Sequence, residues 1–423
     1  MKKAVLLICL LAGTATAQNR LPAGMRPPGC TAGLQLPEGF CATVFADGVR
    51  GARHLVVAPN GDVFINVQGD AATAGVVALR DTNRDGVADV RQRFGSGGGS
   101  GIALDGNTLY ATAGSSIVRY RINPGSLTPA GRPDTVVTAL PMAGPHHAHN
   151  FVLQNRTLFV NIGSATNACQ QRDRVAGSLG NNPCNELNTR AGIWEFDANR
   201  LHQTPSDGHR FATGLRNSVA LTRNPIDGYL YATVHGRDQL HDNWPDLFSA
   251  QKSAENPGEE LVRVDRGSDY GWPYCYYDVD LKTLVLAPEY GGDGRKTAQC
   301  SGKTEPLMAF PGHWAPNGIV FYTGNQFPSQ YKGGAFIAFH GSWNRAPLPQ
   351  AGFRVVFAPF KFNRPSGTYT TFADGFNRDP GPGRAPQGTH RPTGITQAPD
   401  GSLFLTDDSG GTVWRITYRG GAR

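Results

Sequence analysis

Short apolar runs, broken by turn residues, extend along nearly the whole chain. One unit recurs: a strand, a turn that contains Gly, Asn or Asp, and a second strand of apolar and small residues. The unit occurs six times, at residues 55–67, 102–113, 151–162, 219–234, 319–339 and 395–406. A further strand can follow each unit, at 75–80, 117–122, 192–196, 260–264, 353–357 and 412–418. The pattern predicts six sheets of three or four strands and hardly any helix.

Repetition of such a sheet along a chain of 423 residues is typical of a β-propeller. We therefore predict an all-β fold, a six-bladed β-propeller. The segments 163–191 and 266–316 interrupt the spacing, and we expect such insertions to lie on one face and to build the site. Residues 40–46 can complete the last blade and close the ring. The competing architecture is a pair of β-sandwich domains, but no Pro- or Ser-rich linker divides the chain at its middle.

The composition agrees with many short strands, because 54 glycines and 30 prolines punctuate strands and interrupt helices. At the N-terminus two lysines, an apolar run and an A-x-A motif predict a signal peptide over residues 1–17, cleaved after Ala17. A Pro/Gly-rich lead over 18–36 and a propeller domain over 37–420 would follow. We expect the mature protein in the periplasm or outside the cell.

The formal charge of +7 becomes +5 without residues 1–17, because only two lysines are removed with them. No block of like charge marks a nucleic-acid footprint, and we expect no nucleic-acid partner. After the signal peptide, no apolar run approaches the ~20 residues that a membrane helix needs, so we expect no membrane span. The modest positive balance favours anionic ligands.

Six cysteines remain after the signal peptide: Cys30, Cys41, Cys169, Cys184, Cys275 and Cys300. Export makes disulfides expected, although six cysteines allow fifteen connectivities. Proximity in the sequence favours the pairs Cys30 with Cys41, Cys169 with Cys184, and Cys275 with Cys300. No C-x-x-C-H motif for a covalent haem is present. Any electrons that this protein handles must therefore pass to an external acceptor, a cytochrome or a quinone pool.

Three of the eleven histidines lie within four positions: His146, His147 and His149. Histidine has the side-chain pKa closest to neutral, so this cluster indicates proton transfer or metal binding. Gly144-Pro145 predicts a turn just before the strand that starts at residue 151, which places the cluster where a loop enters a sheet. As alternatives, His147 and His149 are hydrogen-bonded scaffold groups, or they form a zinc pair, for which no third ligand is evident nearby.

Five further motifs combine charged, amide and aromatic side chains. They are Gly214-Leu215-Arg216-Asn217, His235-Gly236-Arg237-Asp238, Asp269-Tyr270-Gly271-Trp272-Pro273, His340-Gly341-Ser342-Trp343-Asn344-Arg345 and His390-Arg391-Pro392. Each falls just before or just after a strand, so all can converge at one mouth of the ring. No G-x-S-x-G, P-loop or G-x-G-x-x-G before a helix is present, which argues against a serine hydrolase or a nucleotide enzyme.

In this order, before a final P-D-G hairpin, the histidine cluster and the five motifs resemble the soluble pyrroloquinoline-quinone-dependent sugar dehydrogenases. The closest branch is that of the L-sorbosone and aldose sugar dehydrogenases, and the resemblance runs from about residue 37 to residue 418. Those proteins are six-bladed propellers, in agreement with the count of hairpins. The resemblance implies oxidation of an aldose, or a related sugar aldehyde or alcohol, by hydride transfer to pyrroloquinoline quinone (PQQ) held with Ca²⁺.

The resemblance also implies roles for individual residues. His146 would be the general base that accepts the proton of the sugar hydroxyl. Arg216 and Asn217 would hold carboxylate and carbonyl oxygens of the quinone. Arg345 and Arg391 would be basic groups around the remaining carboxylates, since a tricarboxylate needs several cations.

Two calcium sites are expected. By the same resemblance, the main-chain carbonyls of Gly236 and Arg237 hold the calcium ion of the cofactor. The second site is inferred from the residues alone, because oxygen-bearing side chains at alternate positions followed by Gly form the front half of an EF-hand-type loop. Its ligands would be Asp81, Asn83, Asp85 and Asp89. A plain Asp/Asn-rich turn is the alternative, since Gln92 stands where the bidentate Glu is needed.

The chain departs from the family pattern at three places. Ser164 follows Gly163 where the glucose enzymes carry an aspartate near the histidine, and Thr393 follows Arg391 where they have a second arginine. The sequence around His146 also differs from the usual H-W-x-R-N. Two rival functions therefore stay open: a calcium-dependent propeller lactonase, and a non-catalytic propeller that binds a partner or a carbohydrate.

Three tryptophans lie in or near the insertions: Trp272, Trp314 and Trp343. The apolar face of a sugar packs well on an indole ring, so these residues can line a sugar site. Aromatic residues in loops as often pack against the edges of blades, which is the alternative for each of them.

Overall fold

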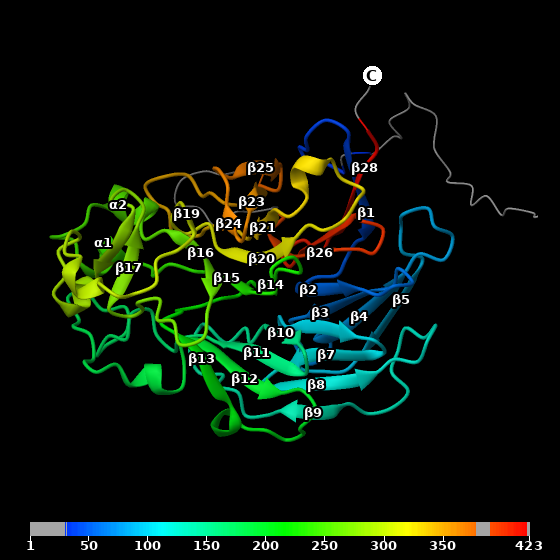
Figure 1. Ribbon diagram of the computed structural model, residues 1–423, viewed down its shortest axis with the longest axis horizontal. Coiled ribbons are helices and arrows are strands. Elements are labelled where there is room, and N and C mark those ends of the chain that lie inside the picture. The colour runs from blue at the N-terminus through cyan, green and yellow to red at the C-terminus, as the bar shows by residue number, and fades with distance from the viewer. Residues whose placement is uncertain (1–29, 31, 378–389, 421–423) are drawn as a thin grey trace, which may run out of the picture.

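The structure, a computed structural model, describes residues 30, 32–377 and 390–420. The predicted signal peptide and residues 18–29 of the lead lie outside the described residues. The described chain forms six four-stranded antiparallel sheets, which are the blades of a ring (Figure 1). The prediction of an all-β, six-bladed β-propeller is confirmed. In the part of the chain that is described, no helix is long and apolar enough to cross a membrane.

The blades follow the chain in order. Blade 1 contains β2 (Ala52–Val57), β3 (Val63–Val67), β4 (Gly75–Arg80) and β5 (Val90–Phe94). Blade 2 contains β6 (Ile102–Asp105), β7 (Thr108–Ala113), β8 (Ser116–Arg121) and β9 (Asp134–Val137). Blade 3 contains β10 (Phe151–Gln154), β11 (Thr157–Ile162), β12 (Gly192–Asp197) and β13 (His209–Thr213). Blade 4 contains β14 (Leu221–Arg223), β15 (Leu230–Val234), β16 (Glu259–Val264) and β19 (Met308–Phe310).

The remaining elements complete the ring and decorate it. Blade 5 contains β20 (Pro316–Phe321), β21 (Ala335–Phe339), β22 (Arg354–Ala358) and β25 (Thr370–Ala373). Blade 6 contains β26 (Pro392–Gln397), β27 (Leu403–Asp407), β28 (Val413–Tyr418) and β1 (Phe40–Ala46). Two small hairpins are β17 (Cys275–Asp278) with β18 (Thr283–Leu286), and β23 (Phe360–Lys361) with β24 (Arg364–Pro365). The helices are α1 (Leu240–Asn243), α2 (Ala250–Glu255) and the 3₁₀ turns η1 (Asn185–Asn188), η2 (Pro205–Asp207), η3 (Pro288–Tyr290), η4 (Ala298–Cys300) and η5 (Ser329–Tyr331).

The ring is closed by pairing the two ends of the chain. The first strands of the blades, β2, β6, β10, β14, β20 and β26, contact one another in this order, and β26 also contacts β2. In blade 6, β1 pairs antiparallel with β28, with Phe40 opposite Tyr418 (Figure 1, blue beside red). The expectation that residues 40–46 complete the last blade is thus confirmed. Because the closing strand is hydrogen-bonded within a blade, the ring has no open edge at the point of closure.

Apolar side chains of neighbouring blades pack face to face and form the core. Phe45 and Phe404 of blade 6 pack edge to face at 4.9 Å, beside Ile65 of blade 1. Between blades 4 and 5, Tyr231 packs on Phe321 with ring centroids 4.8 Å apart. Inner strands are covered on both faces, so every residue of β3 and of β21 is buried. This double burial explains why these strands are almost entirely apolar in the sequence, with Asn66 of β3 as the exception.

A polar residue at the second-to-last position of the second strand ties each of five blades to the next. These residues are Asn66, Thr112, Asn161, Thr233 and Thr406. The side chains bond to main-chain atoms at the start of the following blade: Gly101 O (2.8 Å), His149 O (2.8 Å), Ser218 N (3.3 Å), Pro316 O (2.8 Å) and Arg53 O (2.6 Å), respectively. Blade 5 has Ala338 at this position. These bonds fix the chain at the start of the following blades, where several residues of the site lie.

Removal of one of these bonds is expected to weaken the whole ring. Thr112 is buried; its hydroxyl donates to His149 O and accepts from Gly101 N at 3.2 Å. Thr112→Val keeps the shape but leaves two buried main-chain groups unpaired, so the free energy of unfolding should fall by about 1–3 kcal/mol. Thr108→Val, a half-buried position in the same strand, is the control and should change it by less than about 0.5 kcal/mol. Equal effects of both substitutions in urea unfolding would contradict this role.

Disulfides fasten the two long insertions and the N-terminal lead. The bonded pairs are Cys30–Cys41, Cys169–Cys184 and Cys275–Cys300. These are the three pairings that proximity in the sequence favours. The second and third pairs close loops within the two long insertions, and the first ties the lead to β1.

The two insertions are also bonded to each other. Gln170 Nε2 donates to the Glu289 carboxylate at 3.2 Å, and Trp272 Nε1 donates to Asn167 O at 3.0 Å. In Figure 1, β17 of the second insertion lies at the left of the view together with α1 and α2, away from blades 1 and 2. The insertions therefore form one continuous wall beside blades 3 and 4.

Candidate active site

Motif residues from four blades meet at one mouth of the ring. His146 precedes β10, Arg216 precedes β14, His235 follows β15, His340 follows β21, and Arg391 precedes β26. Electrostatic interactions connect His146 with Arg216 and His235, His235 with His340, and His340 with Arg391. The motifs, which are far apart in the sequence, thus form one row of polar groups across the mouth.

The geometry around His146 fixes its tautomer. Its Nδ1 lies 2.8 Å from Ser164 Oγ and 3.1 Å from Ser164 O. Ser164 Oγ donates its single hydrogen to Thr166 O at 2.7 Å, so it can only accept from the imidazole. Nδ1 must therefore carry the hydrogen, and Nε2 keeps its lone pair. An imidazole held in this way can accept a proton at Nε2.

Burial sets the charge of His146. The side chain is 7% exposed, and burial is the main reason that its pKa lies well below the ordinary value of 6.5; the positive charge of Arg216 lowers the pKa further. Asp238 acts in the opposite direction and favours the protonated form. His146 is consequently neutral at neutral pH, with a carboxylate close enough to stabilise the imidazolium that proton transfer would create.

The other two histidines of the cluster differ from His146. Both ring nitrogens of His149 face main-chain carbonyls, those of Asn161 at 3.3 Å and Pro141 at 3.0 Å, and burial lowers its pKa to about 4. His147 bonds through Nδ1 to Gly144 O at 2.8 Å. The structure supports a scaffold role for both. Among the described residues no group of three or more His, Cys, Asp or Glu could hold a metal ion, so the zinc pair lacks further ligands.

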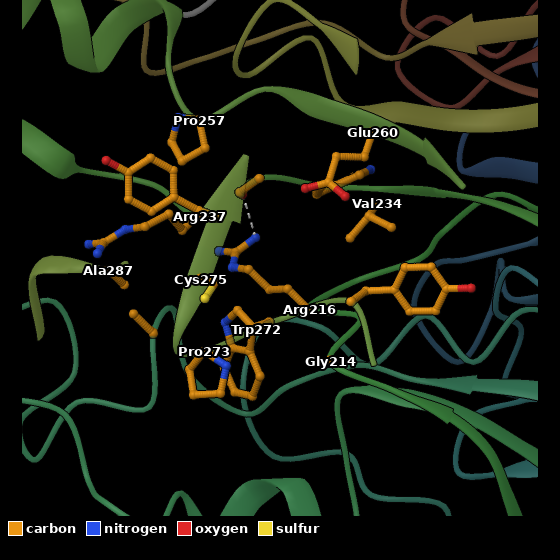
Figure 2. A pocket seen from close by; sticks show the side chains of 15 residues that line it. Gly214, Arg216, Val234, Arg237, Pro257, Glu260, Trp272, Pro273, Cys275 and Ala287 are labelled. Atoms are coloured by element: carbon orange, nitrogen blue, oxygen red, sulfur yellow. Dashed lines mark hydrogen bonds between the residues drawn. The ribbon is translucent and has the colours of Figure 1, made fainter. Parts of the chain in front are cut away.

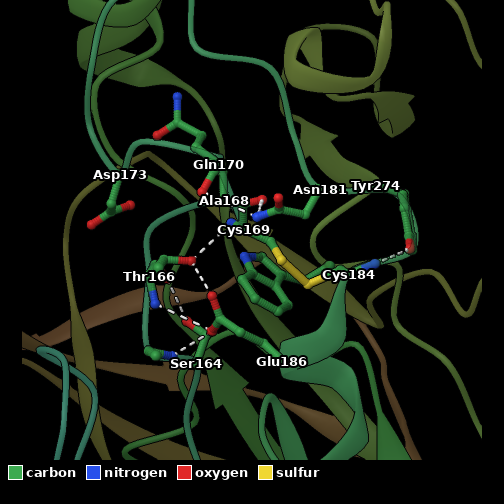
Figure 3. Close-up of a disulfide and its surroundings, with 12 residues drawn as sticks. Ser164, Thr166, Ala168, Cys169, Gln170, Asp173, Asn181, Cys184, Glu186 and Tyr274 are labelled. Atoms are coloured by element: carbon green, nitrogen blue, oxygen red, sulfur yellow. Dashed lines mark hydrogen bonds between the residues drawn. A yellow bond between two sulfur atoms is a disulfide. The ribbon is translucent and has the colours of Figure 1, made fainter.

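A short insertion loop positions Ser164. Figure 3 shows Glu186 beside Ser164 and Thr166, close to the Cys169–Cys184 disulfide. The Glu186 carboxylate accepts from Ala165 N at 2.6 Å and from both N and Oγ1 of Thr166. These bonds hold the turn that contains Ser164, whose oxygen atoms accept the hydrogen bond from His146 Nδ1.

Arg216 is a buried structural centre of the site. Its Nε and Nη2 donate to O and Oδ1 of Asn167, both at 3.0 Å. Nη2 also donates to Asp238 Oδ2 at 3.0 Å, and Nη1 donates to Gly236 O at 2.9 Å, the dashed line in Figure 2. Four of its five N–H groups are therefore used inside the protein, and one on Nη1 remains for a ligand.

Asp238 is the anionic partner of the basic groups around Arg216. Besides Arg216 it accepts from Arg174 Nη2 at 2.9 Å, and its Oδ1 accepts from Asn344 Nδ2 at 2.9 Å. Burial opposes its ionisation, but Arg216 and His313 outweigh burial and hold the pKa of Asp238 well below its usual range. Asp238 thus links blade 4, the insertion over 163–191 and the segment that contains Asn344.

The Gly236–Arg237 main chain is held from both sides. Gly236 N donates to Glu259 at 3.3 Å, and Gly236 O accepts from Arg216. The Arg237 side chain, 3% exposed, forms a buried ion pair with Glu289 and donates to Asn243 at 3.3 Å. In the described part of the chain no group donates to Arg237 O. This carbonyl oxygen is therefore available to a ligand or cation.

The two arginines assigned to further carboxylates differ in position. Arg391 donates from Nε to His340 O at 3.1 Å and from Nη2 to Gly341 O, which places it at the mouth. Arg345 Nη1 donates to Ala254 O and Gly312 O, both at 2.8 Å, and its charge interacts with Glu255. The structure therefore brings Arg391 to the row of polar groups but uses Arg345 to anchor loops of blade 4.

One cationic residue near the site, Arg53 of blade 1, lies outside all of the sequence motifs. Arg53, in β2, donates from Nη1 to Asp408 Oδ2 at 2.7 Å, and the same carboxylate bonds to His340 Nε2 at 2.8 Å. Arg53 also interacts electrostatically with Arg391. Its main chain lies against Gly394, next to Thr393. A second guanidinium therefore stands near the position where Thr393 replaces the family's arginine. A charged residue just before the apolar residues 55–57 of an inner strand is the signal that could have identified it.

A small cavity of about 30 Å³ lies behind Arg216. Figure 2 shows its wall, with Glu260 and Val234 on one side of Arg216 and Trp272 on the other. Burial, and then the neighbouring Glu259, raise the pKa of Glu260 to about 8. The volume suits one or two water molecules but neither a sugar nor a quinone, so this cavity is not the place where reacting groups of that size bind.

The acidic loop of blade 1 is closed by its own hydrogen bonds. Asp81 accepts from the main-chain N–H groups of Asp85 and Gly86, at 3.2 and 2.9 Å. Asp85 accepts from Val87 N at 2.8 Å, and Asp89 accepts from the Thr82 hydroxyl. These are Asx-turn contacts, as expected of the alternative, an Asp/Asn-rich turn. Calcium binding by this loop stays a prediction.

The comparisons with known proteins agree with this arrangement. Residues 34–419 match the family described as TrAA12-like. A PQQ-dependent sugar dehydrogenase of Hypocrea jecorina is 26% identical over 96% of this chain and 94% of that protein. A PQQ-dependent pyranose dehydrogenase of Coprinopsis cinerea is 24% identical over 96% of this chain, which covers only 55% of that protein. An uncharacterised protein of Borreliella burgdorferi is 32% identical over about half of each chain.

Solved structures show the same fold. The holo PQQ domain of the Coprinopsis cinerea pyranose dehydrogenase superposes with a TM-score of 0.73 at 20% identity, covering 91% of this chain and 97% of that one. A calcium structure of the Trichoderma reesei protein of family AA12 also gives 0.73, at 21% identity and 95% and 99% coverage. The resemblance to PQQ-dependent sugar dehydrogenases that the motifs indicated is confirmed. The chain belongs to the TrAA12-like family.

Proposed function

We propose that this protein is an exported quinoprotein oxidoreductase that oxidises an aldose, or a related sugar aldehyde or alcohol, by hydride transfer to PQQ, with His146 as the general base. The observation that carries the proposal is the buried, neutral His146, with Nδ1–H held by Ser164 and a lone pair on Nε2. The named relatives of the chain, which are PQQ-dependent sugar and pyranose dehydrogenases, support the choice of cofactor.

The residues at the mouth fit a cofactor with three carboxylates and a bound Ca²⁺. Arg216 has one unused N–H, and in the described part of the chain Arg53 Nη2 and Arg391 Nη1 donate to no protein group. Asn217 Oδ1 is buried without a partner, which suits a hydrogen bond to a ligand. The carbonyl oxygen of Arg237 suits Ca²⁺, which prefers oxygen ligands. We therefore assign cofactor binding to Arg53, Arg216, Asn217 and Arg391, with calcium at Gly236 and Arg237.

The cofactor and its calcium ion, when bound, supply the hydride acceptor. The protein supplies the base: His146 Nε2 takes the hydroxyl proton of the sugar as the hydride leaves the same carbon. Ser164 keeps the imidazole in the required tautomer, and Asp238 stabilises the imidazolium through space. Arg216 favours return of the imidazole to its neutral form. The proton then has to leave to solvent before the next turnover.

Three disulfides support the proposed export, because such bonds persist in oxidising compartments. We propose that the protein acts in the periplasm or outside the cell and passes electrons to an external cytochrome or quinone pool.

The proposal is tested by loading the purified protein with PQQ and Ca²⁺ and following dye reduction with a panel of aldoses. We expect saturable quinone binding and dye reduction that depends on quinone and on sugar. Acid release from a lactone without any electron acceptor would instead indicate the lactonase. Failure to bind quinone would indicate the non-catalytic propeller.

Substitution of Ser164 should shift the pH dependence of the reaction. The base must be neutral, and the pKa of His146 lies below 6.5, so kcat/KM should be constant through neutral pH and fall only in acid. Ser164→Asp places a carboxylate beside Nδ1, which favours the imidazolium, raises the pKa of His146 and moves the acid limb to higher pH. Ser164→Asn, of similar size without charge, is the control. An acid limb that is the same in both variants would contradict the assigned contact.

A further inference from the structure

One of the six tryptophans is exposed to solvent. Trp343, between β21 and β22, is 58% exposed, whereas Trp272 and Trp314 are buried. Trp272 donates to Asn167 O, and Trp314 packs on Phe339 with ring centroids 5.4 Å apart. Of the three tryptophans that the sequence offered for a sugar site, two are therefore packing residues. Only Trp343 presents its ring to a ligand.

Trp343 borders a surface hollow of about 490 Å³. This hollow, here called the Trp343 hollow, is lined by α1, α2 and the segment after β21, through Gln239, His241, Asp242, Ala250, Ser253, Trp343, Asn344, Ala346 and Pro347. Its volume lies within the range of about 300–1,000 Å³ typical of small-molecule sites. It is thus far larger than the water-sized cavity behind Arg216.

The polar groups that line the Trp343 hollow are suited to hydrogen bonds with the hydroxyl groups of a ligand. The Asp242 carboxylate is exposed, and in the described part of the chain neither it nor the Ser253 hydroxyl bonds to another side chain. His241 Nδ1 lies 2.6 Å from Phe248 O and donates to it, which leaves Nε2 as an acceptor. A carboxylate at the wall disfavours anionic ligands. Neutral ligands rich in hydroxyl groups, with an apolar face for the indole, match this wall best.

The Trp343 hollow is joined to the site by two of its wall residues. Asn344 Nδ2 donates to Asp238 Oδ1 at 2.9 Å, and Gln239 Oε1 accepts from Arg174 Nη1 at 2.7 Å. Asp238 and Arg174 are themselves paired, and Asp238 contacts Arg216. The wall of the hollow is therefore connected through Asp238 and Arg174 to the side chains around Arg216.

We infer that the Trp343 hollow is a saccharide subsite, which holds the second sugar unit of an oligosaccharide whose terminal aldose reacts at His146. The reaction of the terminal unit at His146 rests on the proposed function. Binding of a sugar in the hollow does not. It implies that the natural substrate is a disaccharide or a longer glycan rather than a free monosaccharide. The indole would cover the apolar face of this second unit, and Asp242, His241 and Ser253 would bond to its hydroxyl groups.

The test compares glucose with cellotriose and maltotriose as probes. Calorimetric titration of the full-length mature chain is done before and after loading with PQQ and Ca²⁺. We expect at least one trisaccharide to bind at least tenfold more tightly than glucose, and Trp343→Ala to remove that advantage while Trp343→Phe retains part of it. Phe362→Ala is the control, because Phe362 is 87% exposed in the distant β23–β24 turn and should change nothing.

The outcomes separate the subsite from the proposed function. If Trp343→Ala and the parent oxidise sugars with the same preference for trisaccharides over glucose, the subsite is overturned. The proposed function would then still stand. Binding of a trisaccharide that depends on Trp343, without reduction of the quinone by any sugar, would support the subsite and overturn the function. Absence of trisaccharide binding in the parent would also overturn the subsite.

Discussion

Replacement of His146 by alanine is expected to lower kcat for sugar oxidation by about 10²–10⁴-fold, the usual contribution of a positioned base. Binding of PQQ and Ca²⁺ should remain close to that of the parent, because the proposed ligands of both lie on other residues. The imidazole is buried and bonds only to Ser164 among the described residues, so its removal disturbs few contacts. Stopped-flow reduction of the bound quinone measures the effect directly.

His147→Ala provides a matched control one residue away. His147 is partly exposed and bonds only to Gly144 O in the described structure, so this variant should keep kcat within about threefold of the parent. A His146→Ala variant with a turnover close to normal would contradict the assignment of the base. An equal loss in both variants would mean that the cluster acts through folding of the loop and not through proton transfer.

Removal of the carboxylate partner of Arg237 should cause the largest loss of stability. Glu289 is 2% exposed and accepts from Arg237, from Gln170 at 3.2 Å and from Trp244 at 3.0 Å. Glu289→Ala leaves a buried guanidinium unpaired, which typically costs about 3–5 kcal/mol in the free energy of unfolding. Because Arg237 also provides the proposed carbonyl ligand, the affinity for Ca²⁺ should fall as well. Urea unfolding and calcium titration measure the two effects.

A more exposed pair of the same type is the control for Glu289. Glu195 pairs with Arg266, whose side chain is 64% exposed, and Glu195→Ala should cost no more than about 1 kcal/mol. Substitution of both Arg237 and Glu289 by apolar residues of similar volume should restore much of the stability, since the unpaired charge is removed, but not the calcium affinity. A Glu289→Ala protein as stable as Glu195→Ala would show that the buried pair does not hold the insertions together.

The fold was predictable because a propeller is assembled from local hairpins. Each blade begins with strands that are adjacent in the sequence, such as β6 and β7, and the turns between them contain Gly, Asn or Asp. The side chains that tie one blade to the next were less visible. In the sequence, Asn66 and Thr112 are only polar interruptions of apolar runs. The structure shows that the side chain of each is hydrogen-bonded to the following blade.

The site was predictable where a motif is continuous, and less so where it depends on pairs far apart in the sequence. His146 and Arg216 stand in recognisable motifs. Arg53 and Asp408 are 355 positions apart, and only closure of the ring brings them together. The role of Ser164 depends on the direction of one hydroxyl hydrogen, which is set by Thr166 O. Arg345 lies in a motif, yet the path of the chain directs it to the carbonyls of Ala254 and Gly312.

The most direct test of the account is the anaerobic addition of a sugar to the protein loaded with one equivalent of PQQ and with Ca²⁺. The account predicts that the absorbance of the bound quinone changes to that of its two-electron-reduced form, with one equivalent of sugar consumed, and that the rate falls by about 10²–10⁴-fold in His146→Ala. A quinone that binds at the stated residues but is not reduced by any aldose, sugar aldehyde or sugar alcohol would contradict it.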